Sequence, residues 1–294
     1  MDAPSPDALH EAVLAWYDDH ARELPWRGAS ASAWSVMVSE FMLQQTPVAR
    51  VLPVHAAWLD RWPTPSALAQ ESTGEAVRMW GRLGYPRRAL RLHAAAVAIA
   101  EHHGGEVPTS YDDLLALPGV GDYTASAIAS FAFGQRHVVL DTNVRRVLAR
   151  AVFGEEFPAP AVTRAERELA TTLLPDEPAT AATWAVGTME LGALICTARQ
   201  PSCDTCPLAN LCAWRGAGFP AYDGPPRRGQ AWAGTDRQCR GRIMALARES
   251  EGSVDLASIE AAWPVGDQRE RCLASLVDDR LLVRVGTARY ALPR

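Results

Sequence analysis

The chain has 294 residues, of which 48% are hydrophobic, and a formal net charge of −5. This length suffices for two domains or slightly more, and the apolar content supports a sizeable core that needs no disulfides. The acidic start MDAPSPDALHEAV lacks the apolar stretch of a signal peptide, and no apolar run is long enough to span a bilayer. A secreted or membrane-spanning protein is therefore not expected, and the predicted compartment is a reducing cytoplasm.

Helical periodicity runs through most of the chain. Apolar residues recur close to every 3.6 positions over 6–21, and 35–46 is a largely apolar helix with one acid, Glu40. Residues 109–134 predict a helix, a tight turn at PGVG and a second helix. Further helices are expected at 72–83, 87–105, 141–154, 163–174 and 182–196. The sequence therefore predicts an all-α protein.

The pattern changes after a Pro/Gly-rich linker at 223–235. Three short helices are predicted over 236–279. RLLVRV and ARYALP, on either side of a glycine, then predict a β-hairpin. Three helices and a hairpin in so short a segment are typical of a winged-helix subdomain, here 236–294.

Basic residues are concentrated despite the negative net charge. The segment 78–93 has five arginines and no acid, and 227–242 is also strongly basic, while acids gather elsewhere, as in PTSYDD and AVFGEE. Such clusters are typical of phosphate-binding surfaces, although solvated helix faces give the same pattern. The chain contains no lysine, so every fixed basic side chain is an arginine.

Four cysteines lie in one short segment, CTARQPSCDTCPLANLC, with the spacing Cys-x6-Cys-x2-Cys-x5-Cys. Zinc sites are usually built from two Cys-x2-Cys pairs on separate knuckles, and this segment has only one such pair. A compact loop with four thiolates, and a proline directly after Cys-x2-Cys, is typical of iron–sulfur proteins. The spacing favours a 4Fe-4S cluster over zinc, with disulfides the last alternative. The candidate ligands are Cys196, Cys203, Cys206 and Cys212.

Two short motifs suit phosphate and sugar chemistry. In LPGVGDYTASAI, Gly119 and Gly121 allow backbone N–H groups to face outward at a helix N-terminus and bind a phosphate, although a plain helix–helix turn has the same pattern. Tyr123 lies just inside the second helix. Downstream, Asp141 follows the apolar run VVL, where it can cap the next helix and present a carboxylate.

These motifs together resemble a known family. LPGVGDYTASAI, LDTNVRRVLAR and the cysteine loop are similar in order and spacing to the helix-hairpin-helix DNA glycosylases that contain an iron–sulfur cluster. VSEFMLQQTPVARV and LGYPRRALRLH resemble the MutY adenine DNA glycosylases within that superfamily. The resemblance covers roughly residues 8–222.

The resemblance implies two helical domains with DNA between them. The six-helix barrel with the helix-hairpin-helix would be 29–135, and the iron–sulfur domain would combine 1–28 with 136–222 and hold a 4Fe-4S cluster. The implied enzyme is bacterial, cytoplasmic and nucleoid-associated, and works as a monomer. Its partner would be duplex DNA with adenine opposite 8-oxoguanine or guanine, and no membrane is expected to bind.

The resemblance also assigns catalytic roles. Glu40 would be the general acid that protonates N7 of adenine, unless it is only a paired core carboxylate. Asp141 would stabilise the oxocarbenium ion at the deoxyribose or attack it transiently, supported by Tyr123 and Asn143. The chemistry agrees, because a poor leaving group needs a proton and a sugar cation needs an anion beside it. Apolar surroundings should raise the pKa of Glu40 and so favour its protonated form, whereas nearby hydrogen-bond donors should keep Asp141 ionised.

The resemblance assigns positions to further residues. Trp26 and Arg27 would line the base pocket, and Arg146 and Glu190 would lie between the cluster and the catalytic domain. The residues expected to enter the duplex and face the partner base are Gln45, Thr46, Leu83 and Tyr85. Wedges and a stacking aromatic serve to take a base out of the stack.

Three departures from the family pattern matter. Lyase relatives of the endonuclease III type have a lysine where this chain has Tyr123, and Schiff-base chemistry needs an amine, so a monofunctional glycosylase is expected. Pro86 replaces a second aromatic residue. The C-terminal segment is shorter than the Nudix-like domain of full-length members, which leaves a strict preference for 8-oxoguanine open. This segment either binds DNA through its basic start or only caps the fold.

Two other functions remain as alternatives. The first is a glycosylase for thymine or oxidised pyrimidines, against which Glu40 argues because protonation at N7 is a requirement of purines. The second is an iron–sulfur DNA sensor without catalysis. The pair of Glu40 and Asp141 argues against the sensor, since binding alone needs neither carboxylate.

Overall fold

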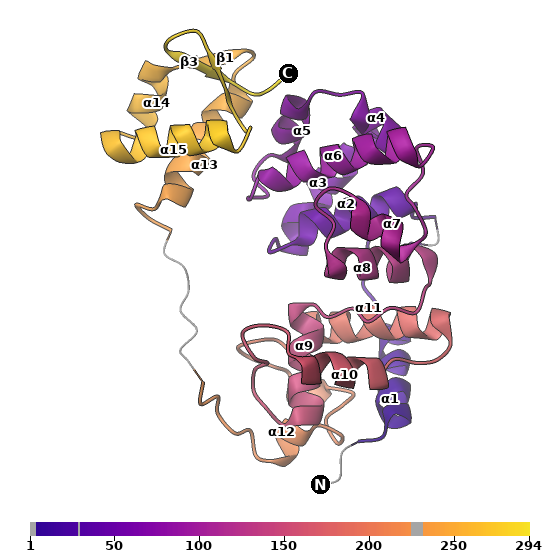
Figure 1. Ribbon diagram of the computed structural model, residues 1–294. Coiled ribbons are helices and arrows are strands. Elements are labelled where there is room, and N and C mark those ends of the chain that lie inside the picture. The colour runs from indigo at the N-terminus through magenta and orange to yellow at the C-terminus, as the bar shows by residue number, and fades with distance from the viewer. Residues whose placement is uncertain (1–3, 29, 225–231) are drawn as a thin grey trace. The chain divides into compact units, whose positions relative to one another are not determined.

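The computed structural model describes residues 4–28, 30–224 and 232–294, which are mostly helical (Figure 1). The all-α expectation is confirmed. No helix in these described ranges is long and apolar enough to cross a membrane. The chain forms two compact units: unit 1 comprises Met1–Val36, Thr109–Leu115 and Gly121–Pro226, and unit 2 comprises Met37–Pro108, Ala116–Val120 and Arg227–Arg294. The domain limits expected from the sequence stay a prediction, and 225–231 of the expected linker lie outside the described residues.

Unit 1 is a helical bundle. It contains α1 (Pro6–His20), most of the hairpin helices α7 (Tyr111–Ala116) and α8 (Asp122–Phe133), and then α9 (Thr142–Leu148), α10 (Arg164–Thr172), α11 (Pro178–Leu194) and α12 (Ala213–Gly216). The core lies where α1 and α9 pack against α11. Leu9 and Val13 of α1, Val147 of α9 and Leu191 of α11 are buried there.

A glycine sets the distance between α9 and α11. A Cβ atom on Gly192 would lie only 2.7 Å from the Cβ of Asn143 and 2.8 Å from its carbonyl oxygen. Any side chain at this position would therefore push α9 away from α11. The close approach fixes the start of α9, which carries Asp141 and Asn143.

The helix expected over 141–154 is interrupted. α9 ends at Leu148, and a π-helical segment, η1 (Ala149–Phe153), continues the chain. Single π turns often occur at functional sites, because they change the direction in which side chains point. Arg150 lies in this turn, and its guanidinium reaches the cysteine loop.

Unit 2 begins with a helical body. α2 (Ala33–Leu43) enters it from unit 1, followed by α3 (Val48–Arg61), α4 (Pro65–Ala69), α5 (Thr73–Trp80) and α6 (Arg87–His102). α6 packs against α4 and α5. Trp58 meets Trp62 and Trp80 edge to face, with ring centroids 4.7 and 5.7 Å apart. Ser72 caps α5 by accepting a hydrogen bond from the backbone N–H of Glu75, as its sequence predicts.

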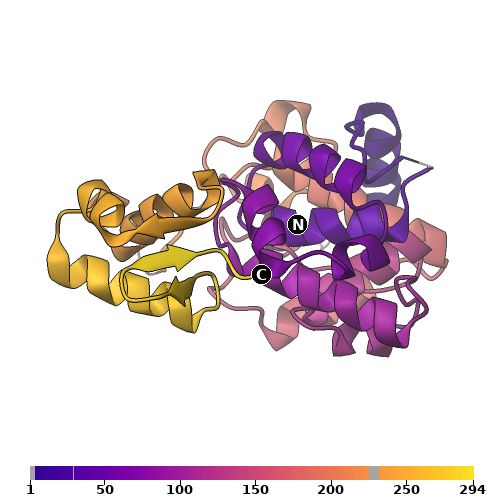
Figure 2. The ribbon, with the colours of Figure 1, turned by 90° about the horizontal axis from the view of Figure 1, so that it is seen from above.

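The C-terminal part of unit 2 has winged-helix topology (Figures 1 and 2). Its elements are α13 (Asp236–Glu249), β1 (Ser253–Asp255), α14 (Leu256–Ala262), α15 (Gly266–Asp278), β2 (Val283–Val285) and β3 (Arg289–Ala291). The antiparallel sheet has the order β1-β3-β2, with Val254 and Arg284 both opposite Tyr290. The three helices and the hairpin match the expectation, whereas β1 was not predicted.

Candidate functional site

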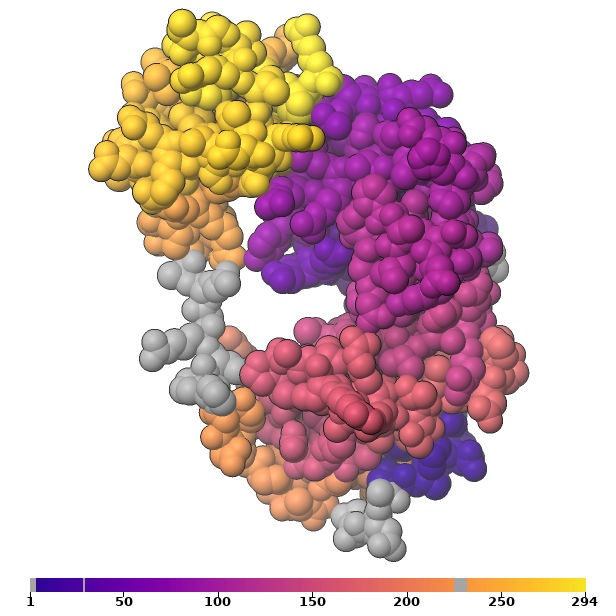
Figure 3. All heavy atoms as spheres, viewed as in Figure 1, coloured from indigo at the N-terminus to yellow at the C-terminus, as the bar shows by residue number. Residues whose placement is uncertain are grey.

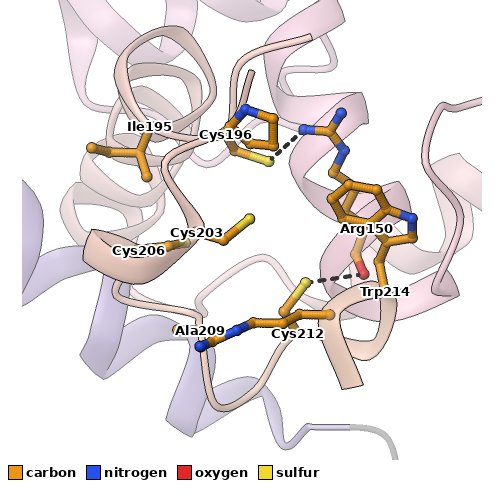
Figure 4. A pocket seen from close by; sticks show the side chains of 10 residues that line it. Arg150, Ile195, Cys196, Cys203, Cys206, Ala209, Cys212 and Trp214 are labelled. Carbon is orange, nitrogen blue, oxygen red and sulfur yellow. Dashed lines mark hydrogen bonds between the residues drawn. The ribbon is translucent and has the colours of Figure 1, made fainter. Parts of the chain in front are cut away.

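The four cysteines of the loop Cys196–Cys212 surround one pocket between α11 and α12 (Figure 4). Among the described residues, no three His, Cys, Asp or Glu side chains converge closely enough to hold a metal ion. Four thiols around one pocket suit a polynuclear cluster, whose irons each take one cysteine.

Arg150 lines the pocket beside these thiols. Its side chain is almost fully buried, and it donates hydrogen bonds to the Sγ of Cys196 at 3.4 Å and to the carbonyl of Thr197 at 2.8 Å. The indole of Trp214 covers the guanidinium at 4.6 Å. A buried cation here opposes the negative charge of four thiolates and fixes the loop around them.

Burial acts on the thiols themselves. It raises the pKa of Cys206 to about 11 and also raises the pKa of Cys203 and Cys212. Without a bound cofactor, the thiols of Cys203, Cys206 and Cys212 are therefore protonated at neutral pH. Because thiolates are the ligands, occupation of the site must release protons.

A second group of side chains surrounds Asp141, at the N-terminus of α9. Its carboxylate accepts hydrogen bonds from the backbone N–H groups of Asn143 and Val144, at 2.8 and 2.6 Å, and from the Asn143 amide at 2.8 Å. Arg146 donates to the amide oxygen of Asn143 at 2.8 Å and to the carbonyl of Cys196 at 2.6 Å. We call this chain from Asp141 to Cys196 the Asp141 network; it connects the carboxylate to the first cysteine of the loop.

The charge state of Asp141 follows from two opposing effects. Burial raises its pKa above the ordinary value, while the hydrogen bonds from Val144 and Asn143 and the charge of Arg146 lower it. Burial is the larger effect. The sequence had suggested donors that simply keep the carboxylate ionised, so the structure adds a desolvation cost that the sequence did not show.

Glu190 on α11 anchors the segment that carries Trp26 and Arg27. Its fully buried carboxylate pairs with Arg22 at 2.6 Å and with Arg27 at 3.0 Å. These cations hold the pKa of Glu190 below its usual value, against the effect of burial. Trp26 is itself buried. The ion pairs thus fix the position of Arg27 within unit 1.

Comparison with known proteins identifies the family. A model described as the HhH-GPD superfamily of base excision DNA repair proteins matches residues 38–171, and the iron-sulfur binding domain of endonuclease III matches 196–212. The adenine DNA glycosylase of Mycobacterium tuberculosis (strain H37Rv) is 53% identical over 96% of this chain and 92% of its own length. This chain belongs to the adenine DNA glycosylase family. The adenine DNA glycosylase of Mycolicibacterium smegmatis is 50% identical over 95% of this chain and 94% of its own length.

Solved structures agree with the fold of an adenine DNA glycosylase. A thermostable thymine-DNA glycosylase matches with a TM-score of 0.64 and 26% identity, over 72% of this chain and 97% of its own. Endonuclease III in a non-covalent complex with DNA matches with a TM-score of 0.61 and 23% identity, over 74% of this chain and 99% of its own. The second likeness shows the shared fold alone.

The family membership and the pocket agree on a 4Fe-4S cluster as the cofactor of this glycosylase. The purified protein should therefore be brown, with broad visible absorption and about four irons per chain. Iron analysis and the absorption spectrum check this. A colourless protein with one stoichiometric zinc would contradict the cluster.

The general-acid candidate of the glycosylase lies on α2. Glu40 is only 6% exposed and lies among apolar residues such as Phe41 and Met37, as its helix pattern predicts. α2 ends at Leu43, three residues after Glu40. The loop that follows carries Gln45 and Thr46, so the candidate acid and two of the four expected wedge residues lie in one short segment.

Arg88 holds this segment in place, and sequence reasoning missed it. Its side chain is 5% exposed, and burial lowers its pKa to about 10. Its terminal nitrogens donate to acceptors of two loops, at 2.6–3.3 Å: the carbonyls of Phe41, Met42, Gln44, Leu83 and Gly84 and the hydroxyl of Thr46. The arginine joins the end of α2 to the loop before α6. The sequence pattern left its segment open between a phosphate-binding surface and a solvated helix face, but Arg88 is buried and fixes two loops from inside the protein.

The four expected wedge residues divide into two kinds. Gln45 and Tyr85 have positive φ angles, 55° and 47°, and both side chains are exposed. Thr46 and Leu83 are buried, and the Thr46 hydroxyl donates to the carbonyl of Leu83 at 3.0 Å. Strained backbone in non-glycine residues is typical of functional loops that their surroundings hold rigid. Gln45 and Tyr85 are therefore the two of the four that are exposed on the surface of unit 2.

The two glycines of the hairpin turn have different environments, and Tyr123 lies just after them in α8. Gly119 has a φ of 78°, and a Cβ there would lie 2.6 Å from the side chain of Arg91, so this position requires glycine. Gly121 is the N-cap of α8 with an ordinary extended φ and open space around it. Tyr123 packs against the small cluster of Ala127, Val139 and Ala185.

Proposed function

We propose that this chain hydrolyses the N-glycosidic bond of adenine paired with 8-oxoguanine or guanine in duplex DNA. It would act as a monomer on the nucleoid DNA of a bacterial cytoplasm. The observation that supports this best is the Asp141 network, a carboxylate held by three hydrogen bonds in a chain whose relatives are adenine DNA glycosylases over almost its full length. An oriented anion of this kind suits a cationic sugar.

The reaction uses the two carboxylates in opposite states. Glu40 in its protonated form gives a proton to N7 of adenine, so that the base leaves as a neutral group. Asp141 in its ionised form faces the positive charge that develops on the deoxyribose. Tyr123 and Asn143 hold the sugar and Asp141. Water completes the hydrolysis, and no bond to the enzyme is required.

The other residues bind and orient the DNA. Trp26 and Arg27 line the pocket for the flipped adenine, with Arg27 held by Glu190. Gln45 and Tyr85 enter the duplex at the partner base, and Thr46 and Leu83 support them from below. Gly119 and Gly121 present backbone N–H groups to a phosphate.

The cysteines Cys196, Cys203, Cys206 and Cys212 ligate the cluster in this proposal. The cluster, when bound, holds the loop 196–212 in one conformation. Arg146 then transmits the position of Cys196 to Asn143 and Asp141 through the hydrogen bonds described above.

A base-release assay tests the function. Cluster-loaded protein is incubated with duplexes that hold a single adenine opposite 8-oxoguanine, guanine or thymine, a thymine opposite guanine, or an oxidised pyrimidine. Adenine should be released opposite 8-oxoguanine and guanine. Release of thymine or the oxidised base instead would identify a different glycosylase, and binding without any release would identify a DNA sensor.

The product should retain an intact abasic site. The chain has no lysine, so no side-chain amine is present to form a Schiff base with the opened sugar. Strand cleavage is therefore expected only after added alkali, which a denaturing gel with and without alkali will show. Efficient cleavage without alkali, together with borohydride trapping of an internal residue, would refute the monofunctional proposal.

A further inference from the structure

The C-terminal winged-helix subdomain packs against α5 and α6 within unit 2 (Figure 3). Arg78 of α5 donates to the carbonyls of Arg248 and Ser250, and Arg248 donates back to the carbonyl of Val77 at 3.2 Å. At the other end of α5, a Cβ on Gly74 would clash with the carbonyl oxygen of Pro293, so the two backbones lie in close contact. These contacts place the subdomain beside the loop that carries Tyr85.

The usual recognition helix of a winged helix is unsuited to DNA here. It corresponds to α15, whose exposed acids are Asp267, Glu270 and Asp278. Its two arginines are already paired within the subdomain, Arg269 with Glu260 at 3.0 Å and Arg271 with Asp236 at 2.8 Å. Phosphates would meet net negative charge on this face.

α13 has the opposite character. Arg237 and Arg242 are exposed on it, whereas Arg240 turns inward to pair with Asp279 at 2.6 Å. The side chain of Trp232, 53% exposed, lies along the same helix, under the guanidinium of Arg237 at 5.3 Å and 3.8 Å from a Cβ built on Gly241. An exposed aromatic ring stacked with an arginine is a common platform for nucleic acid.

This platform continues into the strained loop. The terminal nitrogen Nη1 of Arg237 lies 3.3 Å from the hydroxyl of Tyr85, and Tyr85 is 46% exposed. Arg87, two residues after Tyr85 at the start of α6, pairs with Asp279 of the subdomain at 3.3 Å. Tyr85, Arg237 and Trp232 thus form one continuous exposed surface across the two parts of unit 2.

We propose that the N-terminal half of α13 is a DNA-binding site, in which Arg237 and Arg242 contact phosphates of the strand that carries the partner base. The choice of strand rests on the proposed function, which places Tyr85 at the partner base. The subdomain then binds duplex through α13 rather than through α15. Its contribution is to affinity and register, since phosphate contacts position a protein on DNA without reading its sequence.

The salt dependence of DNA binding tests this site. Cluster-loaded full-length protein is titrated with an undamaged duplex, and with one that holds an uncleavable carbocyclic adenosine opposite 8-oxoguanine. For Arg237→Gln and for Arg242→Gln, the slope of log K against log salt should become less steep by about 0.9 each. Arg237→Lys and Arg242→Lys keep the charge and should restore the slope.

Two control variants make the result specific. Arg164→Gln removes an exposed arginine of α10 in unit 1 and should leave the slope unchanged. Arg284→Gln removes a charge from strand β2 of the β2–β3 wing, the other place where a winged helix contacts DNA. The proposal would be overturned if the slope stayed unchanged in Arg237→Gln and Arg242→Gln, or if it became less steep in Arg284→Gln instead. It would also be overturned if the lysine variants did not restore the slope. Binding needs no turnover, so failure of the glycosylase assay would be a separate result.

Discussion

Glu40→Gln should lower the single-turnover rate of adenine release by about 10³-fold or more, while binding to the mispair stays nearly unchanged. Glutamine keeps the size and hydrogen-bonding reach of the side chain but has no carboxylic proton to transfer. Adenine is a very poor leaving group unless it is protonated. The loss of rate should therefore lie at the upper end of what general acids contribute. Binding depends mainly on phosphate contacts and on the exposed loops, neither of which uses this buried carboxylate.

The controls separate catalysis from packing. Glu101→Gln changes an exposed glutamate at the end of α6 and should leave both the rate and the affinity as they are. Rates come from quenched single-turnover reactions, and affinities from titration with an uncleavable duplex. A Glu40→Gln protein with turnover within about tenfold of wild type would mean that another group is the acid. Joint loss of binding, activity and thermal stability would identify Glu40 as a structural carboxylate of α2.

The sequence predicted those parts of the molecule whose signals are local. Helix caps, the hairpin glycines and the cysteine spacing are all carried by neighbouring residues. Most of the expected helices and the cysteine pocket are present, although the helix expected over 141–154 is interrupted and α3 and α4 were not predicted. Asp141 was recognised as an N-cap for the same reason, because the two backbone N–H groups it accepts from are its near neighbours.

Parts that depend on distant contacts were missed or misjudged. Arg88 looked like one of five basic side chains, but its acceptors are up to 47 residues away, so only the folded chain shows that it points inward. Gly192 gave no signal for the same reason, since its partner Asn143 lies on another helix. Strand β1, which was not predicted, is three residues long. It forms its ladder by pairing with β3, near the C-terminus.

Asp141→Asn should also reduce adenine release by about 10³-fold, but through loss of charge rather than loss of a proton donor. Asparagine caps a helix as well as aspartate does, so α9 should keep its first turn. What disappears is the negative charge opposite the sugar cation, worth about 3–4 kcal/mol in a water-excluded site. Asp255→Asn, the same exchange at the N-cap of α14, should leave the rate unchanged. Turnover of Asp141→Asn within about tenfold of wild type would contradict the counter-charge role.

The pH dependence gives this prediction a second readout. Burial raises the pKa of Asp141 in the folded protein, so the ionised form that catalysis needs is the form that folding disfavours. The acid limb of the rate should therefore lie above pH 3.9, the ordinary value for aspartate. Stability changes in the opposite sense: the native state binds the extra proton, so its advantage is complete below the unfolded pKa and is lost as the pH rises through the folded pKa. Wild type should thus lose unfolding free energy relative to Asp141→Asn across this window, measured by denaturant titration at each pH. A constant difference between the two proteins would mean that burial and the hydrogen bonds cancel, so that folding does not shift the pKa of Asp141.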